Sequence, residues 1–395
     1  MRSRWIVVVA MGSSQAIAWA SSFYLPAVLA QPLSRDIGLS PAWIYGALSL
    51  ALFVSAALGP LCGRIIDAHG GRGMLVISNL LFTVALVILS LARGPLSLFG
   101  AWLLFGVAMA TGLLETAFAA LTRMYGDQAR GPLTGVALLT GLSSTVGWPV
   151  SALFEHRFGW QGTCLLWALL NLILALPLNA WALKGNPAAR SSDARVASTP
   201  DVSSAPNKRI WILTFVFATT GIVSNGLATN LPALFTALGA SSLAAIGAAS
   251  LMGPAQVGSR LLEFCARRWA TPLTSARVAG GLHAIGAVVL GTFGAPAIAV
   301  FAVIQGGGNG ILTIVRGTLP LALFGSQGFG TQLGKISVWA RTGHAVAPFL
   351  FSAVIERYGG GVLFLSCALS MVAFIALFSG SLTGLPSGEV PSRED

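Results

Sequence analysis

The chain has 395 residues, of which 55% are hydrophobic and only 9% are charged, and its mean hydropathy is +0.80. A water-soluble protein carries about 25% charged residues, so the composition excludes a soluble domain. The net charge of +11 does not indicate nucleic-acid binding, because the charges lie in short segments between apolar runs and not on one basic face. The four cysteines are scattered and form no C-x-x-C pair, so neither a metal site nor a disulfide framework is indicated.

Twelve apolar runs follow one another along the chain, and each is long enough to cross a bilayer as an α-helix. They cover residues 5–29, 43–65, 74–92, 96–122, 131–154, 160–183, 210–238, 242–264, 272–293, 295–321, 329–354 and 360–382. The first run follows Arg2 and Arg4 as a signal sequence would, but it is too long for a signal peptide and further runs follow, so we expect it to be retained. The pattern predicts an all-α membrane protein with 12 transmembrane helices.

The segment between the sixth and seventh runs is rich in Ser, Ala, Pro and basic residues, and its composition predicts a flexible linker. We therefore predict an N-terminal six-helix bundle at 1–183, a linker at 184–209, a C-terminal six-helix bundle at 210–382 and a tail at 383–395.

The two halves also resemble each other, since four identities between residues 125–135 and 324–334 recur at one offset, half the chain length. Two similar hydrophobic halves are typical of a secondary transporter whose substrate site lies where the halves meet.

Lysine and arginine are distributed unequally between the two ends of the predicted helices. Sixteen lie on the side of the N-terminus, four lie on the opposite side, and Arg316, Lys335 and Arg341 fall within spans. The positive-inside rule then predicts that both termini are cytoplasmic. We expect a multi-pass protein of a bacterial inner membrane.

The loop after the second run, residues 63–72, reads GRIIDAHGGR. It resembles the signature loop of the major facilitator superfamily, with Ala68 and Gly71 at two positions where that family usually has a base. The twelve runs, the two halves and the long middle segment are similar to that family too. The resemblance implies two pseudo-symmetric six-helix bundles that move against each other.

The resemblance further implies that Asp67 faces the positive end of the eleventh helix and latches the cytoplasmic side shut. The pattern Arg64-x-x-Asp67 returns in the second half as Arg260-x-x-Glu263. We therefore expect gating residues in both halves, namely Asp67, Arg64, Arg72, Glu263, Arg260 and Lys335. Capping of helices by the same side chains is the alternative.

Arg341 lies near the middle of the eleventh run, and Ser337 and His344 share its helix face. A charge inside the bilayer costs roughly 3 kcal/mol or more, so it normally faces a cavity or a partner. The planar guanidinium suits a carboxylate or another oxyanion, which makes Arg341 and His344 candidate substrate ligands. The alternative is a structural charge paired within the protein.

The tenth run carries four polar residues at helical spacing, and Glu115 on the fourth run lies at nearly the repeat-equivalent position. The four are Gln305, Asn309, Thr313 and Arg316. We expect this stripe to face the interior, with Gln305, Asn309 and Arg316 as candidate substrate ligands; lining of the path, or snorkelling of Arg316, is the alternative. We predict that Glu115 pairs with Arg316, so that an anionic substrate competing for the arginine frees the carboxylate to take up a proton. His344 is the rival proton carrier, and His283, alone on an apolar helix, is expected to be a packing residue.

Other polar and aromatic residues inside the spans are candidate cavity liners. They are Gln15, Trp19, Asn225, Gln256 and Trp148. Polar packing between helices is the alternative role for these residues.

The pattern as a whole favours a secondary transporter of a small organic anion that works by alternating access, with either proton coupling or anion exchange. A proton-coupled drug or sugar efflux antiporter is the alternative, and it would need an acidic cavity. A receptor would need a soluble output domain, and an enzyme would need a catalytic cluster, neither of which the sequence shows. We expect no cofactor and no metal, and the expected partners are the substrate, a proton or counter-anion and the lipid bilayer around a monomer.

Overall fold

The protein is helical throughout the residues that the computed structural model describes, which are 4–125, 128–183, 208–266, 269–324 and 329–383. The first half contains α1 (Arg4–Ala20), α2 (Pro26–Ile37), α3 (Pro41–His69), α4 (Gly71–Ser90), α5 (Pro95–Gly112), α6 (Leu114–Tyr125), α7 (Arg130–Thr140), α8 (Ser143–Leu170), a π-helical turn (Asn171–Ala175) and α9 (Leu176–Ala182). The second half contains α10 (Lys208–Ala237), α11 (Ser242–Ser250), α12 (Met252–Ala266), α13 (Pro272–Phe293), α14 (Ile298–Phe324), α15 (Phe329–Tyr358), α16 (Val362–Ala376) and α17 (Gly380–Thr383), with short 3₁₀ turns at Ala295–Ala297 and Gly359–Gly361. Most of the predicted linker and tail lies outside the described residues, but Lys208 and Arg209 already belong to α10.

Eight described segments are long and apolar enough to cross a membrane. Two of them, Gly131–Ala182 and Ala340–Ala376, each cover most of two predicted spans. Gly159, with φ of 68°, divides the first of these two segments inside α8. The first and eighth predicted spans are each broken into two shorter helices, α1 with α2 and α11 with α12. The arrangement is consistent with the predicted count of twelve.

The first predicted span, 5–29, is not a continuous helix. The structure ends α1 at Ala20, turns through residues 21–25 and continues as α2 to Ile37. Ser22 donates its hydroxyl to the carbonyl of Ala18 at 2.6 Å, and Pro26, which has no N–H, opens α2. A side-chain bond to the backbone and a proline together interrupt the helical ladder, so the predicted span was wrong in its continuity and its end.

The outside of the helical bundle is apolar. Leu96 and Phe364 expose 89% and 83% of their surface, and many other leucines, valines and phenylalanines are exposed around them. Inside, the largest cluster of buried apolar side chains spans both halves, and smaller clusters lie within one half, around Val7 and Leu121 in the first and around Leu213 and Leu319 in the second. Exposed apolar side chains in this number suit hydrocarbon and not water.

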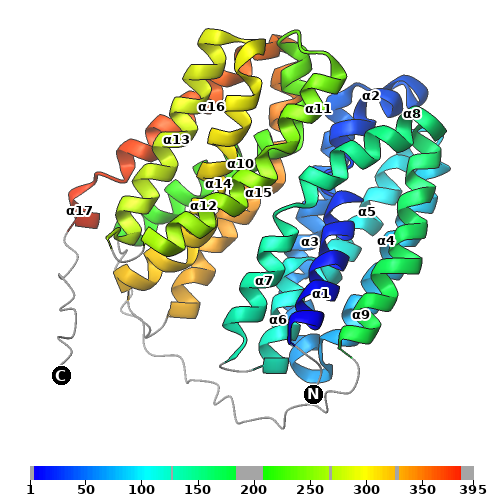
Figure 1. Ribbon diagram of the computed structural model, residues 1–395, viewed down its shortest axis with the longest axis horizontal. Coiled ribbons are helices and arrows are strands. Elements are labelled where there is room, and N and C mark those ends of the chain that lie inside the picture. Colours follow the sequence, from blue (N-terminus) through cyan, green and yellow to red (C-terminus); the bar gives the residue numbers. More distant parts are fainter. Residues whose placement is uncertain (1–3, 126–127, 184–207, 267–268, 325–328, 384–395) are drawn as a thin grey trace.

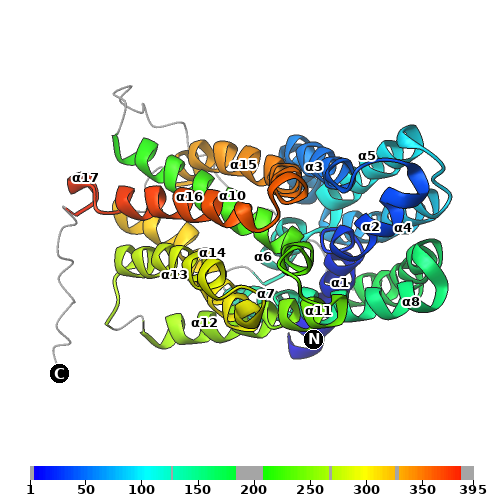
Figure 2. The same ribbon diagram turned by 90° about the horizontal axis from the view of Figure 1, so that it is seen from above.

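The helices of the two halves form two groups that lie side by side (Figures 1 and 2). We call the end that carries the α2–α3 turn the distal end and the end that carries the start of α1 the proximal end. Figure 1 shows the two groups approaching at the distal end and separating toward the proximal end. The most extensive contact between the halves is that of α3 with α15, and α11 also packs on α8.

Three hydrogen bonds join α3 to the second half near the distal end. The backbone N–H of Ala42 donates to Glu356 Oε2 at 3.2 Å, and that of Phe349 donates to Ser49 Oγ at 3.2 Å. The Tyr45 hydroxyl donates to the carbonyl of Thr229 at 3.3 Å. These contacts join the halves near the distal end, and the pocket described next lies between the halves.

Candidate functional site

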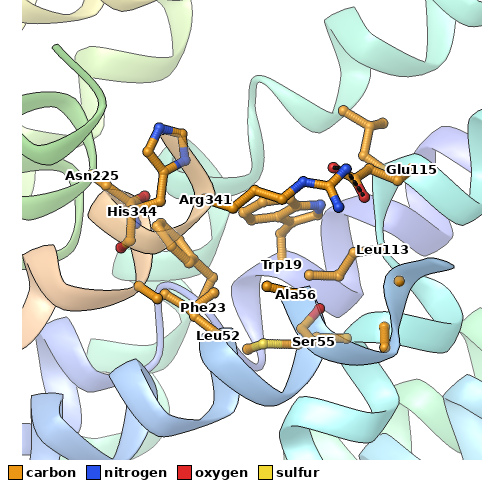
Figure 3. Close-up of a pocket in the computed structure, with 15 residues that line it drawn as sticks. Trp19, Phe23, Leu52, Ser55, Ala56, Leu113, Glu115, Asn225, Arg341 and His344 are labelled. Carbon is orange, nitrogen blue, oxygen red and sulfur yellow. Dashed lines mark hydrogen bonds and ion pairs between the residues drawn. The ribbon is translucent and has the colours of Figure 1, made fainter. Parts of the chain in front are cut away.

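A pocket of about 180 Å³ lies between the two halves near their middle (Figure 3). Helices α1, α3, α5 and α6 of the first half line it, together with α10 and α15 of the second half. Most of the first half's lining is apolar, and the second half contributes mainly polar side chains. The pocket therefore has an apolar wall and a polar wall from different halves.

An ion pair between the halves crosses this pocket. Arg341 Nη2 on α15 lies 3.2 Å from both carboxylate oxygens of Glu115 on α6. Figure 3 shows the two side chains pointing toward each other. The Arg341 and Glu115 side chains are 41% and 77% exposed, so water reaches the pair. Glu115 thus pairs with Arg341, and the predicted pairing of Glu115 with Arg316 was wrong in its partner.

A break between α5 and α6 places Glu115 in the pocket. Leu113 has an extended backbone (ψ −174°), so α5 ends at Gly112 and α6 starts again at Leu114. Glu115 then lies in the first turn of α6, where the helix dipole favours a carboxylate. Gln15 Nε2 donates to the carbonyl of Gly112 at 2.7 Å, which satisfies a backbone group that the break exposes. The candidate liner Gln15 therefore supports the break and does not line the pocket.

His344 and Asn225 form the polar wall beside Arg341. His344 is one helical turn after Arg341, and Asn225 Nδ2 donates to the carbonyl of His344 at 2.6 Å. The Nε2 atom of His344 is buried and has no hydrogen-bond partner among the described residues. The structure thus brings the predicted residues Arg341, His344 and Asn225 together.

Aromatic side chains from α1 and the following turn form the apolar wall. Trp19 and Phe23 line the pocket with ring centroids 5.1 Å apart, and Tyr24 packs edge-on against Phe23 at 5.0 Å. Trp148 is fully buried behind them, 5.4 Å from the Tyr24 ring, so it backs the wall and does not line the pocket. The sequence interpretation missed Phe23, although its four-residue spacing from Trp19 was a usable signal.

Two of the polar residues of α14 have different surroundings, and substrate binding by this stripe stays a prediction. Gln305 Oε1 lies 2.8 Å from His283 Nδ1 on α13, and both side chains are buried. Thr313 on the same helix is exposed. His283 thus has the packing role expected for it, and Gln305 is its partner. Gln256 on α12 is 8% exposed and lies against Gly310 of α14, away from the pocket's lining residues.

The predicted gating residues make contacts of different kinds. Arg72 Nε donates to the carbonyl of Ala180 at 3.0 Å, Arg64 Nε to that of Pro60 at 3.5 Å, and Glu263 accepts from the Ser275 hydroxyl at 2.6 Å. None of these contacts joins the two halves: those of Arg72 and Arg64 lie within the first half, and that of Glu263 lies within the second. The side chains of Asp67 and Lys335 lie outside the described part of the chain, so the predicted latch to α15 stays a prediction.

Arg260 is the gating candidate that reaches the other half. Its Nη1 donates to the carbonyl of Ala137 on α7 at 2.9 Å, and its Nη2 donates to Thr313 Oγ1 at 3.4 Å. Arg260 and Glu263 thus bond different partners, and their predicted role as the latch of the second half stays a prediction. Arg260 was among the cations expected near the proximal end. Its long side chain explains how the guanidinium extends from there to Ala137 on α7.

Residues 11–295 match the family model of the Major Facilitator Superfamily. The chain belongs to the major facilitator superfamily. It is therefore a multi-pass membrane transporter and not an enzyme, and the family prediction from the loop at 63–72 is confirmed.

Two solved structures show the same fold at low sequence identity. A bacterial homolog of the human lysosomal transporter Spinster, in an inward-facing and occupied conformation, is 15% identical with a TM-score of 0.68, and the match covers 95% of this chain and 94% of that one. A mutant of the nucleoside transporter NupG is 14% identical with a TM-score of 0.76, and the match covers 95% of this chain and 100% of that one. No curated protein matches the sequence.

Proposed function

We propose that this superfamily member transports a small organic anion, such as a carboxylate, by alternating access. The observation that carries the proposal is the Arg341–Glu115 pair in the pocket between the halves. A guanidinium presents two parallel N–H donors that match the two oxygens of a carboxylate. The substrate's carboxylate would replace that of Glu115 on Arg341.

The exposure of the pair supports this exchange. Ion pairs that water reaches contribute only about 0–1 kcal/mol, because solvent screens both charges. Glu115 is 77% exposed and sits at a helix N-terminus, so it keeps favourable surroundings after losing its partner. A substrate therefore displaces the carboxylate at little cost.

The apolar wall indicates what the rest of the substrate looks like. Trp19, Phe23 and Leu52 line the pocket next to Asn225 and His344 (Figure 3). Covering an apolar surface with another apolar group contributes roughly 25 cal/mol of favourable free energy per Å² removed from water. A small molecule with one acidic group and an apolar body would use both walls.

Coupling would follow from the same exchange. In proton-coupled transport, an anionic substrate would take Arg341, and closure of the pocket around it would then remove Glu115 from water and favour its protonated form. Exchange for a second anion is the other mode, in which Arg341 always has one anion or Glu115 as its partner. With the proximal end in the cytoplasm, as the charge bias predicts, the structure would represent an inward-open state of a bacterial inner-membrane protein.

The test is uptake of labelled small carboxylates by purified protein in liposomes, alongside an Arg341→Gln variant. We expect exchange of at least one carboxylate by the wild type and a loss of about tenfold or more in the variant, since a charged hydrogen bond contributes about 1.5–3 kcal/mol. Arg277→Gln is the control, because Arg277 bonds Leu377 on the far side of the second half.

Transport of neutral or cationic compounds without any carboxylate transport would contradict the proposal. It would favour the drug or sugar antiporter instead, for which the exposed Glu115 carboxylate would be the ligand.

A further inference from the structure

A further basic side chain, that of Arg316, lies near His344. Arg316 extends from α14, and a Cβ atom on Gly221 of α10 would lie 3.5 Å from Arg316 Nη2 and would overlap the His344 imidazole. The absence of a side chain at Gly221 thus lets both groups converge on one point of α10. The His344 imidazole thus lies between Arg316, which shares the space over Gly221, and Arg341, one turn earlier on α15.

Arg316 differs from Arg341 in that no described residue supplies it with a counter-charge. No hydrogen bond or ion pair joins the Arg316 guanidinium to another described residue, and its Nε atom is buried. The buried Nε2 atom of His344 also has no hydrogen-bond partner among the described residues. An unpaired charge inside a membrane protein is costly, so such a group normally faces a ligand or a water-filled path.

A third cation borders the same place. Arg260 donates to Thr313 Oγ1 at 3.4 Å, and Thr313 lies one helical turn before Arg316 on the same face of α14. The Nε atom of Arg260 is also buried without a partner among the described residues. Thr313 itself is exposed, so the cluster borders the surface of α14.

From this geometry we infer that Arg316, His344 and Arg260 form a second anion-binding site, separate from the Arg341–Glu115 pair, that takes a small oxyanion group. The group is either a free inorganic anion such as phosphate or the second acidic group of a dianionic substrate, and only the latter form rests on the proposed function. Two guanidinium groups without a carboxylate supply the positive charge, and their planar N–H donors match oxyanion oxygens.

The present partners of Arg341 and Arg316 determine which of the two sites an anion occupies first. Arg341 already has Glu115, which a small anion must displace, whereas Arg316 and the Nε of Arg260 have vacant donors. An inorganic anion at low concentration therefore binds at Arg316 first. This gives the two sites different responses to the same probe.

The first test measures the melting temperature of the purified protein against inorganic phosphate at constant ionic strength. We expect a saturable rise in the wild type, in Arg277→Gln and in Arg341→Gln. In Arg316→Gln the apparent Kd rises at least tenfold, and Arg316→Lys, which keeps the charge, retains part of the response. His344→Ala is a second variant that weakens the response without removing a guanidinium.

An unsaturable or absent response in the wild type overturns the inference, as does a response of Arg316→Gln equal to that of the wild type. Equal loss in Arg341→Gln and Arg316→Gln would also overturn it, because the phosphate would then bind at one shared site. This arm needs no transport activity, so it decides the inference even if the proposed function fails.

A transport arm distinguishes the two sources of the oxyanion group. Succinate and butyrate have the same carbon number and differ in one carboxylate. If the second site holds the substrate's other acidic group, Arg316→Gln loses succinate transport at least tenfold and keeps butyrate transport. If it holds a free ion, phosphate stimulates butyrate transport in the wild type, and Arg316→Gln removes the stimulation. Equal loss of both substrates without a phosphate effect contradicts both forms.

Discussion

At the scale of single residues, the ion pair of Glu115 and Arg341 has a specific geometry but contributes little free energy to holding the two side chains together. Both carboxylate oxygens lie 3.2 Å from one guanidinium nitrogen, yet both side chains are open to water. Such a contact orients the arginine without holding it strongly. It also joins α6 to α15, so its exchange for a substrate would change how the two halves are connected.

Substitution of Glu115 by Gln separates binding from coupling. The amide keeps the size of the side chain but cannot take up a proton on release from Arg341. We expect the variant to exchange labelled anion at about the wild-type rate and to lose accumulation driven by a pH gradient. Both are measured in the same proteoliposomes, with the gradient imposed by dilution.

Glu155→Gln is the control for this substitution, because Glu155 lies on α8 in a different pocket. Unchanged accumulation in Glu115→Gln would show that Glu115 is not the coupling group, and His344 would then be tested in its place.

At the scale of elements, the sequence located most helices but not their interruptions. Hydropathy over residues 96–122 predicted one span, whereas the structure has α5 and α6 with an extended residue, Leu113, between them. Hydropathy averages over a window and cannot detect one residue that leaves the helical region. The break depends on tertiary contacts, since Gln15 from α1 satisfies the exposed carbonyl of Gly112.

The same limit explains the outcome at the candidate site. Helical spacing correctly grouped Arg341 with His344, because both are on one helix. It could not choose between Arg316 and Arg341 as the partner of Glu115, since that choice depends on how α6 meets α14 and α15. Spacing also could not show that Gln305 turns toward His283.

Close packing of α3 on α5 gives a prediction with a matched control. A Cβ atom at Gly106 would lie 2.7 Å from the carbonyl oxygen of Ala51, a backbone atom that cannot move away, and Gly100 on the same helix has open space around it. We expect Gly106→Ala to destabilise the protein by about 1–3 kcal/mol through overpacking. Gly100→Ala should be neutral or slightly stabilising, because alanine favours the helix.

The measurement is the melting temperature of both variants in the same detergent. A melting temperature for Gly106→Ala as high as that of Gly100→Ala would mean that α3 and α5 are farther apart than the structure has them.

At the scale of the whole molecule, the two halves are joined at the distal end by contacts that involve helix termini. Pro41 and Ala42 begin α3, and the Ala42 N–H donates to Glu356 near the end of α15. A carboxylate at a helix N-terminus is stabilised by the helix dipole by about 0.3–1 kcal/mol. Because donor and acceptor lie in different halves, this energy favours the arrangement in which the distal end is closed.

Substitution of Glu356 by Gln should therefore shift the conformational equilibrium toward opening at the distal end. Loss of about 0.3–1 kcal/mol corresponds to a change of roughly twofold to fivefold in the ratio of closed to open molecules. Spin labels at the exposed residues Leu91 and Leu243, one in each half, report the separation as a distance distribution in a variant without the four cysteines. Glu155→Gln is the matched control, since Glu155 lines the same distal pocket as Glu356 but lies on α8 of the first half. A distance distribution in Glu356→Gln that coincides with the control would show that the charge on Glu356 does not hold the distal end closed.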